Sequence, residues 1–254
     1  VTGDHPIMDG SKQRVRTDGD KPKETAGFYF AYLDGHPAGF IKNNRTGEEI
    51  KWKSKGYTFS PEEKAKMMAE SATKLAVREA QNAAQRDSSA KRVSEQQAKL
   101  KPIETPTPYQ SHKNIAVHPG TYTDDEGQTT FIPAYDTQGK QWTMQYIDAD
   151  GTKRFAKDSQ KEGSFHVIGG QDALITAPAI VISEGYATAA TLTENLGYAT
   201  VAAFDAGNLI HVAKALKAQY PDKPILIAGD DDKHLEMMQG VNPGKDKAEK
   251  AAAQ

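Results

Sequence analysis

The sequence predicts an α/β protein in which a C-terminal sheet of alternating strands and helices is preceded by a small antiparallel α+β subdomain, a long helical linker and an N-terminal β-rich unit. Three observations predict this class. Short aromatic and apolar runs separated by turn residues fill the start of the chain, a stretch rich in Ala, Gln, Lys, Arg and Glu follows, and three apolar runs then alternate with helix-like segments. We place the four parts at residues 1–59, 60–108, 109–172 and 173–254.

The first part begins with polar residues, rich in Gly and Asp up to residue 20, which we expect to form a loosely held arm. The aromatic run at 28–33 predicts a strand, Asp34-Gly35 predicts a hairpin turn, and 38–41 predicts the returning strand. A third short strand at 50–52 completes a β unit that is too small to be stable without further packing.

The second part is a predicted helix from Ser60-Pro61 to about Leu100. Large apolar residues become rare after Val77, so we expect its second half to have little to bury. From Lys51 to Lys101 the chain carries 12 Lys and Arg against 6 Asp and Glu. Two interpretations stay open: a solvated helical linker, and a basic arm that lies along a phosphate backbone.

The third part follows three prolines between residues 102 and 108. Apolar runs at 131–135, 142–147, 152–155 and 165–168, with turn residues between them, predict an antiparallel meander. We expect its turns and edges to bring together five basic residues: Lys140, Lys153, Arg154, Lys157 and Lys161.

The fourth part alternates three buried-type strands with three helices. The strands are predicted at 179–183, 199–204 and 224–228, and the helices at 184–196, 209–219 and 245–253. In such sheets ligands bind at the carboxyl ends of the strands, so the residues after each strand are the candidates for a site.

Acidic residues follow two of these strands. Glu184 comes directly after the first, and Asp230, Asp231 and Asp232 follow the third. Neighbouring carboxylates repel one another unless a cation neutralises them, and hard divalent cations prefer oxygen ligands. The pattern predicts a Mg²⁺ or Mn²⁺ site with Asp230 and Asp232 as ligands and Glu184 as a further ligand or general acid/base. Asp231 would point away and serve the turn.

Composition excludes several classes. The chain has 254 residues, a formal net charge of −2 and no cysteine, so it has no disulfide, no thiolate zinc site and no cysteine nucleophile. No apolar run is long enough to cross a bilayer, and the start lacks a signal-peptide core, so we expect a cytoplasmic protein. Neither a P-loop nor a G-x-G-x-x-G pattern occurs. Because the chain starts at Val1 and stops in a helix-like run, we expect a fragment whose last domain is cut short.

The hexapeptide Glu184-Gly185-Tyr186-Ala187-Thr188-Ala189, EGYATA, resembles the signature of the primases of conjugative plasmids (TraC type) and of related phage replication proteins. With Asp230-x-Asp232, it resembles the two motifs of the Toprim domain, which primases, topoisomerases and some nucleases share. The likeness extends to 203–209, 242–248, the 109–170 meander and the 27–52 unit, and therefore covers most of the chain.

This resemblance implies synthesis of short RNA primers on single-stranded DNA from ribonucleoside triphosphates, with Mg²⁺ or Mn²⁺ as cofactor. Many primases recognise their template through a cysteine-ligated zinc module, but we expect no zinc here because the chain has no cysteine. Glu184, Asp230 and Asp232 would form the catalytic metal site. The resemblance also implies a role in plasmid conjugation or replication, beside a relaxase, a helicase or similar proteins, and no membrane partner. The residues expected to bind nucleotide or DNA are Lys140, Lys153, Arg154, Lys161, Gly185 and Asn208.

Two other functions stay open at this point. The same carboxylates would serve a Toprim metal-dependent nuclease. The chain could also be a catalytically silent nucleic-acid-binding module of a conjugation or replication protein.

Overall fold

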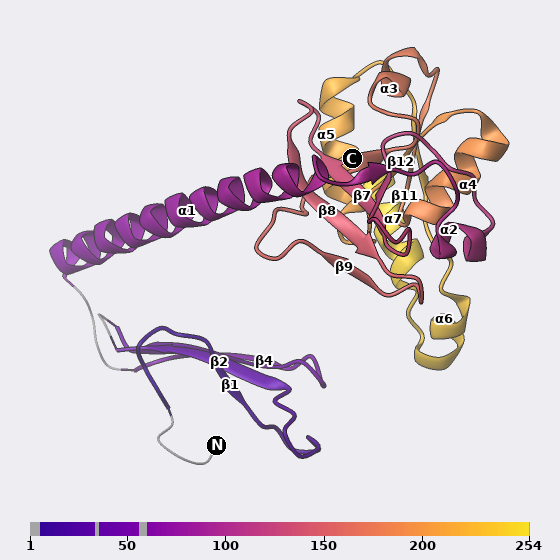
Figure 1. The fold of residues 1–254 in the computed structure, drawn as a ribbon. Coiled ribbons are helices and arrows are strands. Elements are labelled where there is room, and N and C mark those ends of the chain that lie inside the picture. The colour runs from indigo at the N-terminus through magenta and orange to yellow at the C-terminus, as the bar shows by residue number, and fades with distance from the viewer. Residues whose placement is uncertain (1–5, 34–35, 56–59, 254) are drawn as a thin grey trace. The chain divides into compact units, whose positions relative to one another are not determined.

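The computed structural model describes residues 6–33, 36–55 and 60–253, and the chain divides into two compact units, Val1–Arg78 and Glu79–Gln254. The predicted mixed α/β class is confirmed, since helices and three separate sheets are present (Figure 1). Among the described residues, no helix is long and apolar enough to span a membrane. Each unit is described by itself below.

The first unit contains a four-stranded antiparallel sheet, one strand more than the sequence predicts. The extra strand lies in the expected loose arm, where Val15 and Met8 pack against Tyr29 and Ala31. The prediction of a loose arm is therefore wrong for these residues, because a small apolar cluster holds them. The expected turn at Asp34-Gly35 falls outside the described residues. The sheet has the order β1 (Gln13–Val15), β2 (Gly27–Tyr32), β3 (Ala38–Asn43) and β4 (Glu49–Lys53).

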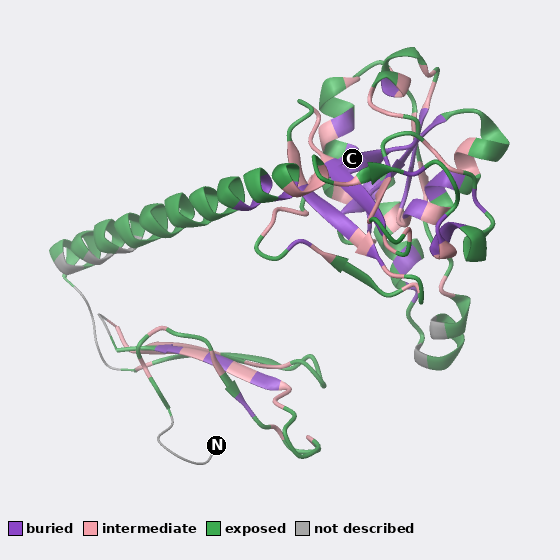
Figure 2. Ribbon diagram, in the orientation of Figure 1, coloured by how far each residue is buried: buried purple, intermediate pink, exposed green. Residues whose placement is uncertain are grey.

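The predicted long helix is confirmed as α1 (Pro61–Gln97). Its buried residues lie near its C-terminal end, in the half that we expected to have little to bury. The described side chains from Pro61 to Ser88 are exposed, whereas Ser89, Ala90 and Val93 are buried (Figure 2). Val93 packs with Phe131 and Met144 of the following sheet. Hydrogen bonds also hold this end of the helix, since Arg92 donates to the Lys157 carbonyl oxygen at 2.6 Å and Gln96 accepts from the Tyr146 hydroxyl at 2.8 Å.

The second unit contains a five-stranded antiparallel sheet that is packed on both faces. Phe131 and Met144 face the end of α1, while Ile132 and Ile147 face the rest of the unit. This alternation follows from the twofold period of a strand. The order is β5 (Lys101–Pro102), β6 (Tyr122–Thr123), β7 (Thr130–Tyr135), β8 (Gln141–Ile147) and β9 (Lys153–Phe155).

The other sheet of this unit has three parallel strands and one antiparallel edge strand, in the order β10 (His166–Val167), β12 (Ala199–Ala202), β11 (Ile180–Ser183) and β13 (Ile225–Ala228). The first crossover, through α4 (Tyr186–Leu196), leads to one side of β11, and the second, through α5 (Leu209–Gln219), leads to the other. Helices α4 and α5 pack into different apolar clusters on the two faces. The sheet therefore has a topological switch point between β11 and β13, where such folds bind ligands.

Four further helices complete the second unit. The predicted third helix of the alternating region is confirmed and packs on α5 and β13, and its residue Ala251 is buried. The three shorter helices are not predicted from the sequence. These helices are α2 (Pro108–Lys113), α3 (Asp172–Thr176), α6 (Lys233–Gln239) and α7 (Pro243–Ala252).

Candidate active site

The predicted acidic residues follow two neighbouring parallel strands. Ser183, the last residue of β11, pairs with Ala228, the last residue of β13. Glu184 therefore begins the chain segment beyond β11, and Asp230 lies two residues beyond β13 at the same edge. This edge is the carboxyl end of the sheet at its switch point.

Glu184 lies in a strongly acidic environment. Burial raises the pKa of its carboxyl, and the negative charge of Asp230 raises it further. Asp232 and Asp205 contribute in the same direction, while a hydrogen bond from the Asp230 main-chain amide lowers it. The Oε1 atom of Glu184 is buried without a hydrogen-bond partner among the described residues. A cation at this point would satisfy that oxygen and relieve the repulsion.

One carboxylate oxygen of Asp232 is already hydrogen-bonded within the protein. Its Oδ2 accepts a hydrogen bond of 3.0 Å from the Gly244 main-chain amide, in the first turn of α7. The Asn242 side-chain oxygen accepts from the main-chain amides of Asp232, at 3.0 Å, and Lys245, at 3.2 Å. These bonds tie the segment after β13 to the N-terminus of α7, where an anionic group is favoured.

Asp231 serves the turn, as the sequence predicts. Its Oδ1 accepts a 2.9 Å hydrogen bond from the Asn242 amide, and its Oδ2 lies 3.1 Å from the Lys233 ammonium. Both contacts lie within the segment that joins β13 to α7, and they lower the pKa of the Asp231 carboxyl.

No three His, Asp or Glu side chains in the described parts of the chain lie close enough together to hold a metal ion. The predicted set of Glu184, Asp230 and Asp232 is therefore not gathered into a finished coordination shell. The chemistry of the set still fits a hard cation, because Glu184 has an unsatisfied buried oxygen and Asp230 is exposed.

Asp205 is a fourth carboxylate at this edge that the sequence analysis did not select. It follows β12, and its carboxylate forms an ion pair with the Lys161 ammonium. The signal that would have found it is the same strand-end rule that selected Glu184 and Asp230.

Asn208 holds the loop that carries Lys161. It is buried, and its Oδ1 accepts a 2.8 Å hydrogen bond from the Gly163 amide. Its Nδ2 donates to the carbonyl oxygens of Ser164 at 2.9 Å and Ala203 at 2.8 Å. Both polar atoms of the Asn208 side chain are therefore hydrogen-bonded to main-chain groups.

Within the EGYATA motif, only part of the segment faces the core. Tyr186 and Ala189 are fully buried, and burial raises the pKa of the Tyr186 phenol to about 12. Gly185 has an extended backbone at the start of α4, and a Cβ there would meet no atom closer than Thr188 Oγ1 at 3.8 Å. Packing within the chain thus explains Tyr186 and Ala189 but does not require a glycine at position 185.

The expected cluster of five basic residues does not form. Lys140 precedes β8, whereas Lys153 pairs with Ile147 at the other end of that strand. Seven residues of strand separate the two ends by about 20 Å. Lys140 instead binds Asp87 at 2.6 Å and lies 3.6 Å from the centre of the Trp142 ring. The prediction is wrong because it ignored the length of the strand between the two turns.

Lys153 and Arg154 face opposite sides of the five-stranded sheet. Arg154 pairs with Asp148 at 2.9 Å and lies over Tyr146, on the face toward α1. Lys153 lies 5.7 Å from the centre of the Tyr109 ring, on the other face. This arrangement follows from the strand itself, in which successive side chains point in opposite directions.

Lys153 lies at a cleft near the acidic edge. Partial desolvation lowers the pKa of its ammonium, the charge of Lys113 lowers it further, and the charge of Asp230 raises it. The cleft has a volume of about 600 Å³, and the basic side chains of His112 and Lys113, which the sequence analysis did not select, also line it. Its lining residues are Pro108, Tyr109, His112, Lys113, Ala149, Asp150, Gly151 and Lys153.

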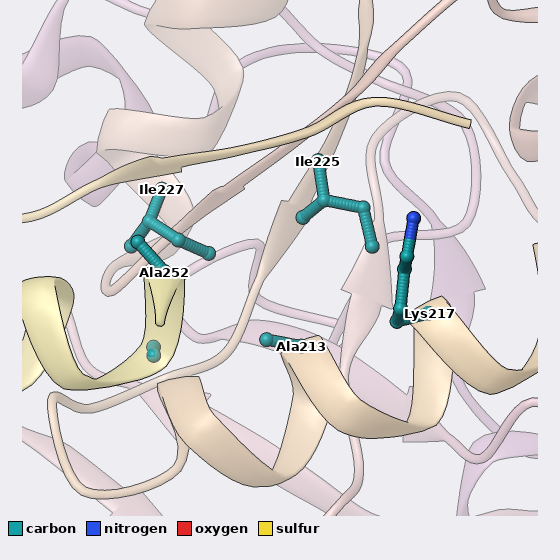
Figure 3. Close-up of a pocket in the computed structure, with 6 residues that line it drawn as sticks. Ala213, Lys217, Ile225, Ile227 and Ala252 are labelled. Carbon is teal, nitrogen blue, oxygen red and sulfur yellow. The ribbon is translucent and has the colours of Figure 1, made fainter. Parts of the chain in front are cut away.

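A second, smaller cavity of about 160 Å³ lies between β13, α5 and α7. Figure 3 shows Ile225 of β13 beside Lys217 of α5, and Ile227 of β13 beside Ala252 of α7. No carboxylate is among the residues that line it.

The chain is similar in sequence to part of two larger proteins. The chain is 63% identical over 250 residues to a DNA primase TraC of Escherichia coli, and 62% identical over 250 residues to a second Escherichia coli protein of that name. Each match covers 98% of this chain but only 24% and 17% of the respective relative. The chain thus spans a quarter or less of the length of these relatives. No family model matches it.

Two solved structures are similar in part. The primase fragment of the bacteriophage T7 primase-helicase protein is 15% identical with a TM-score of 0.40, over 56% of this chain and 59% of that one. A chain in the structure of the bacteriophage T7 lagging-strand DNA polymerase interacting with primase domains is 17% identical with a TM-score of 0.35, over 53% of this chain and 63% of that one. With TM-scores below 0.5, neither likeness bears on the function of this chain.

Proposed function

We propose that this chain is the catalytic part of a DNA primase of the TraC type, which joins ribonucleotides into short primers on single-stranded DNA. The observation that carries the proposal is the 63% identity to a DNA primase TraC over 98% of this chain. The carboxylates that follow β11 and β13 support it, because they lie where a sheet of this topology binds its ligand.

We further propose that the acidic edge works as a Toprim-like site. Mg²⁺ or Mn²⁺, when bound, would neutralise the charge that develops on the phosphates during nucleotidyl transfer. Asp230 and the free oxygen of Asp232 would hold the ion. Glu184 would be a further ligand, or would accept the proton of the primer's 3′-hydroxyl, a role that its raised pKa favours.

The cationic side chains near this edge would bind phosphates. Lys153 and Lys113 line one cleft, and the field of Asp230 reaches Lys153. Lys161 neutralises Asp205 at the same edge and would move its ammonium to an incoming triphosphate. These contacts support a binding site for the anionic part of a ribonucleoside triphosphate beside the carboxylates.

The remaining predicted residues would act less directly. Gly185 would let a nucleotide approach the main chain at the start of α4, since packing alone does not require glycine there. Asn208 would position the Lys161 loop and would not contact the nucleotide. Arg154 and Lys140 would contact template backbone elsewhere on the unit, since neither lies on the cleft.

A product assay tests the proposal. The chain is incubated with single-stranded DNA, labelled ribonucleotides and Mg²⁺ or Mn²⁺, and the products are resolved by length. Labelled primers support the proposal. Shortened DNA without primers would indicate the nuclease, and DNA binding without either product would indicate a catalytically silent module, and both results contradict it.

A further inference from the structure

The sheet of the first unit has one face on which aromatic rings and cations alternate. Paired residues of neighbouring strands share a face. Arg14 pairs with Phe28, which pairs with Lys42. Phe30 pairs with Phe40, which pairs with Lys51. We call this surface the aromatic face, and its residues are Arg14, Phe28, Phe30, Tyr32, Ala38, Phe40, Lys42, Glu49, Lys51 and Lys53.

The rings of this face lie close together and are only partly buried. Phe28 lies 5.8 Å from Phe30 and 6.0 Å from Phe40, measured between ring centres. Along β2, Tyr29 and Ala31 on the opposite face are buried, while Phe28 and Phe30 are intermediate (Figure 2). The apolar cluster of this unit therefore lies on the opposite face, and the rings remain accessible.

The cations around the rings include several without a counter-ion. Lys42 pairs with Glu49 at 2.5 Å. Arg14, Lys51 and Lys53 form no ion pair with any residue that the structure describes. Lys12 adds a further ammonium, 4.0 Å from the centre of the Phe28 ring. The strand positions of this face therefore carry four cations against one carboxylate, that of Glu49, around the partly open rings.

The opposite face of the same sheet has a different character. Its exposed side chains include Ile41, Ile50 and Trp52, with no Lys or Arg among the paired positions of β3 and β4. An apolar protein partner would match that opposite face. The aromatic face matches a ligand that presents flat rings and a negatively charged backbone together.

We infer that the aromatic face binds single-stranded DNA. Bases stack on Phe28, Phe30 and Phe40, and their phosphates lie against the cations at the edges of the face. A double helix cannot bind in this way, because its base faces are hidden in the stack. The choice of DNA over RNA rests on the proposed function, in which the template is DNA.

Fluorescence anisotropy with a labelled oligo-dT of about 20 nucleotides tests this inference on the full chain, in the absence of nucleotides. Phe40→Leu is expected to weaken binding about fivefold or more, since each stacked base contributes on that scale. The double change Lys51→Gln and Lys53→Gln is expected to reduce the slope of log K against log salt concentration by about 1.4, the value for the loss of two phosphate contacts on a single strand.

Matched variants separate the face from the rest of the unit. Trp52→Leu removes a ring from the opposite face of β4, and Lys21→Gln with Lys23→Gln removes two charges outside the strands. Both are expected to bind like the unchanged chain. Equal weakening by these controls, or no weakening by Phe40→Leu and the Lys51 and Lys53 changes, would overturn the inference.

Photo-crosslinking of the unchanged chain needs no variant and so does not depend on folding of a mutant. Oligonucleotides with 5-bromouracil are expected to attach to the tryptic peptide 24–42, which carries all four rings of the aromatic face. Adducts confined to other peptides, or tighter binding of oligo-U than of oligo-dT, would contradict the assignment. Glu184→Gln is expected to bind DNA unchanged, so loss of primer synthesis and failure of this inference are distinguishable.

Discussion

Gly244→Ala, in the first turn of α7, is expected to destabilise the protein, although alanine is usually more stabilising than glycine inside a helix. A Cβ at this position would lie 2.3 Å from the Asp230 carbonyl oxygen and 3.2 Å from Asp232 Oδ2. Real Cβ atoms do not approach a main-chain oxygen that closely. Gly244→Ala must therefore move α7 and the Asp230–Asp232 segment apart by about 1 Å.

The magnitude follows from two opposing contributions. Replacement of glycine by alanine inside a helix ordinarily stabilises a protein by about 0.5–1 kcal/mol. Overpacking of a close contact costs about 1–3 kcal/mol. The expected result is a net loss of about 1 kcal/mol of unfolding free energy. Because misplacement by about 1 Å slows catalysis about 100-fold, the loss of primer synthesis is expected to be much larger than the loss of stability suggests.

Urea unfolding of the second unit measures the first effect. The chain has two tryptophans, so in a Trp52→Phe background the fluorescence of Trp142 reports this unit alone. Lys247→Ala, on the exposed side of α7, is the matched control and is expected to stay within about 0.5 kcal/mol. A Gly244→Ala chain that is more stable than the unchanged one, with full primer synthesis, would refute the close contact and its role in the site.

Three further predictions concern the same unit. Burial lowers the pKa of His166 to about 4, below its unfolded value near 6.5, so the unfolded chain binds a proton at a higher pH than the folded chain. The free energy of unfolding is therefore expected to fall by about 3 kcal/mol between pH 7 and pH 4. Urea unfolding at a series of pH values measures this dependence, which His166→Gln should flatten. Asn208→Ala leaves several buried main-chain groups unpaired and is expected to destabilise the unit by about 2–4 kcal/mol, while the exposed Asn195→Ala change should have an effect near zero. Lys153→Ala is expected to raise the KM for ribonucleotides about tenfold, and Arg154→Ala, on the other face of the sheet, should leave that KM within about twofold in steady-state primer assays. A KM that responds equally to both changes would contradict the placement of the cleft.

Much of the fold could be predicted from local sequence. The apolar runs that form β11 and β12 are continuous because both faces of the sheet are covered at these strands, and this makes them visible without a structure. Two strands of only two or three residues, β1 and β6, carry too little periodicity to be found. They form because a longer neighbouring strand provides main-chain hydrogen-bond partners along its edge.

The site was predictable only in part, for a similar reason. Glu184 and Asp230 could be selected because a fold rule links strand ends, and their chemical roles stay predictions. The bond between Asp232 and the Gly244 amide could not be foreseen, since it joins residues twelve positions apart through the position of α7. The separation of Lys140 from Lys153 likewise depends on which ends of the strands meet.

The most direct test of the central claim compares neighbouring carboxylates in the same primer-synthesis assay, with single-stranded DNA, labelled ribonucleotides and Mg²⁺ or Mn²⁺. Glu184→Gln and Asp230→Asn are each expected to reduce primer synthesis by about 100-fold or more, because each removes a charge from the acidic edge. Asp231→Asn retains an oxygen that can accept from Asn242 and is expected to remain within a few-fold of the unchanged chain. Equal activity of the Asp230→Asn and unchanged chains, or equal loss from Asp230→Asn and Asp231→Asn, would contradict the placement of the active site at the ends of β11 and β13.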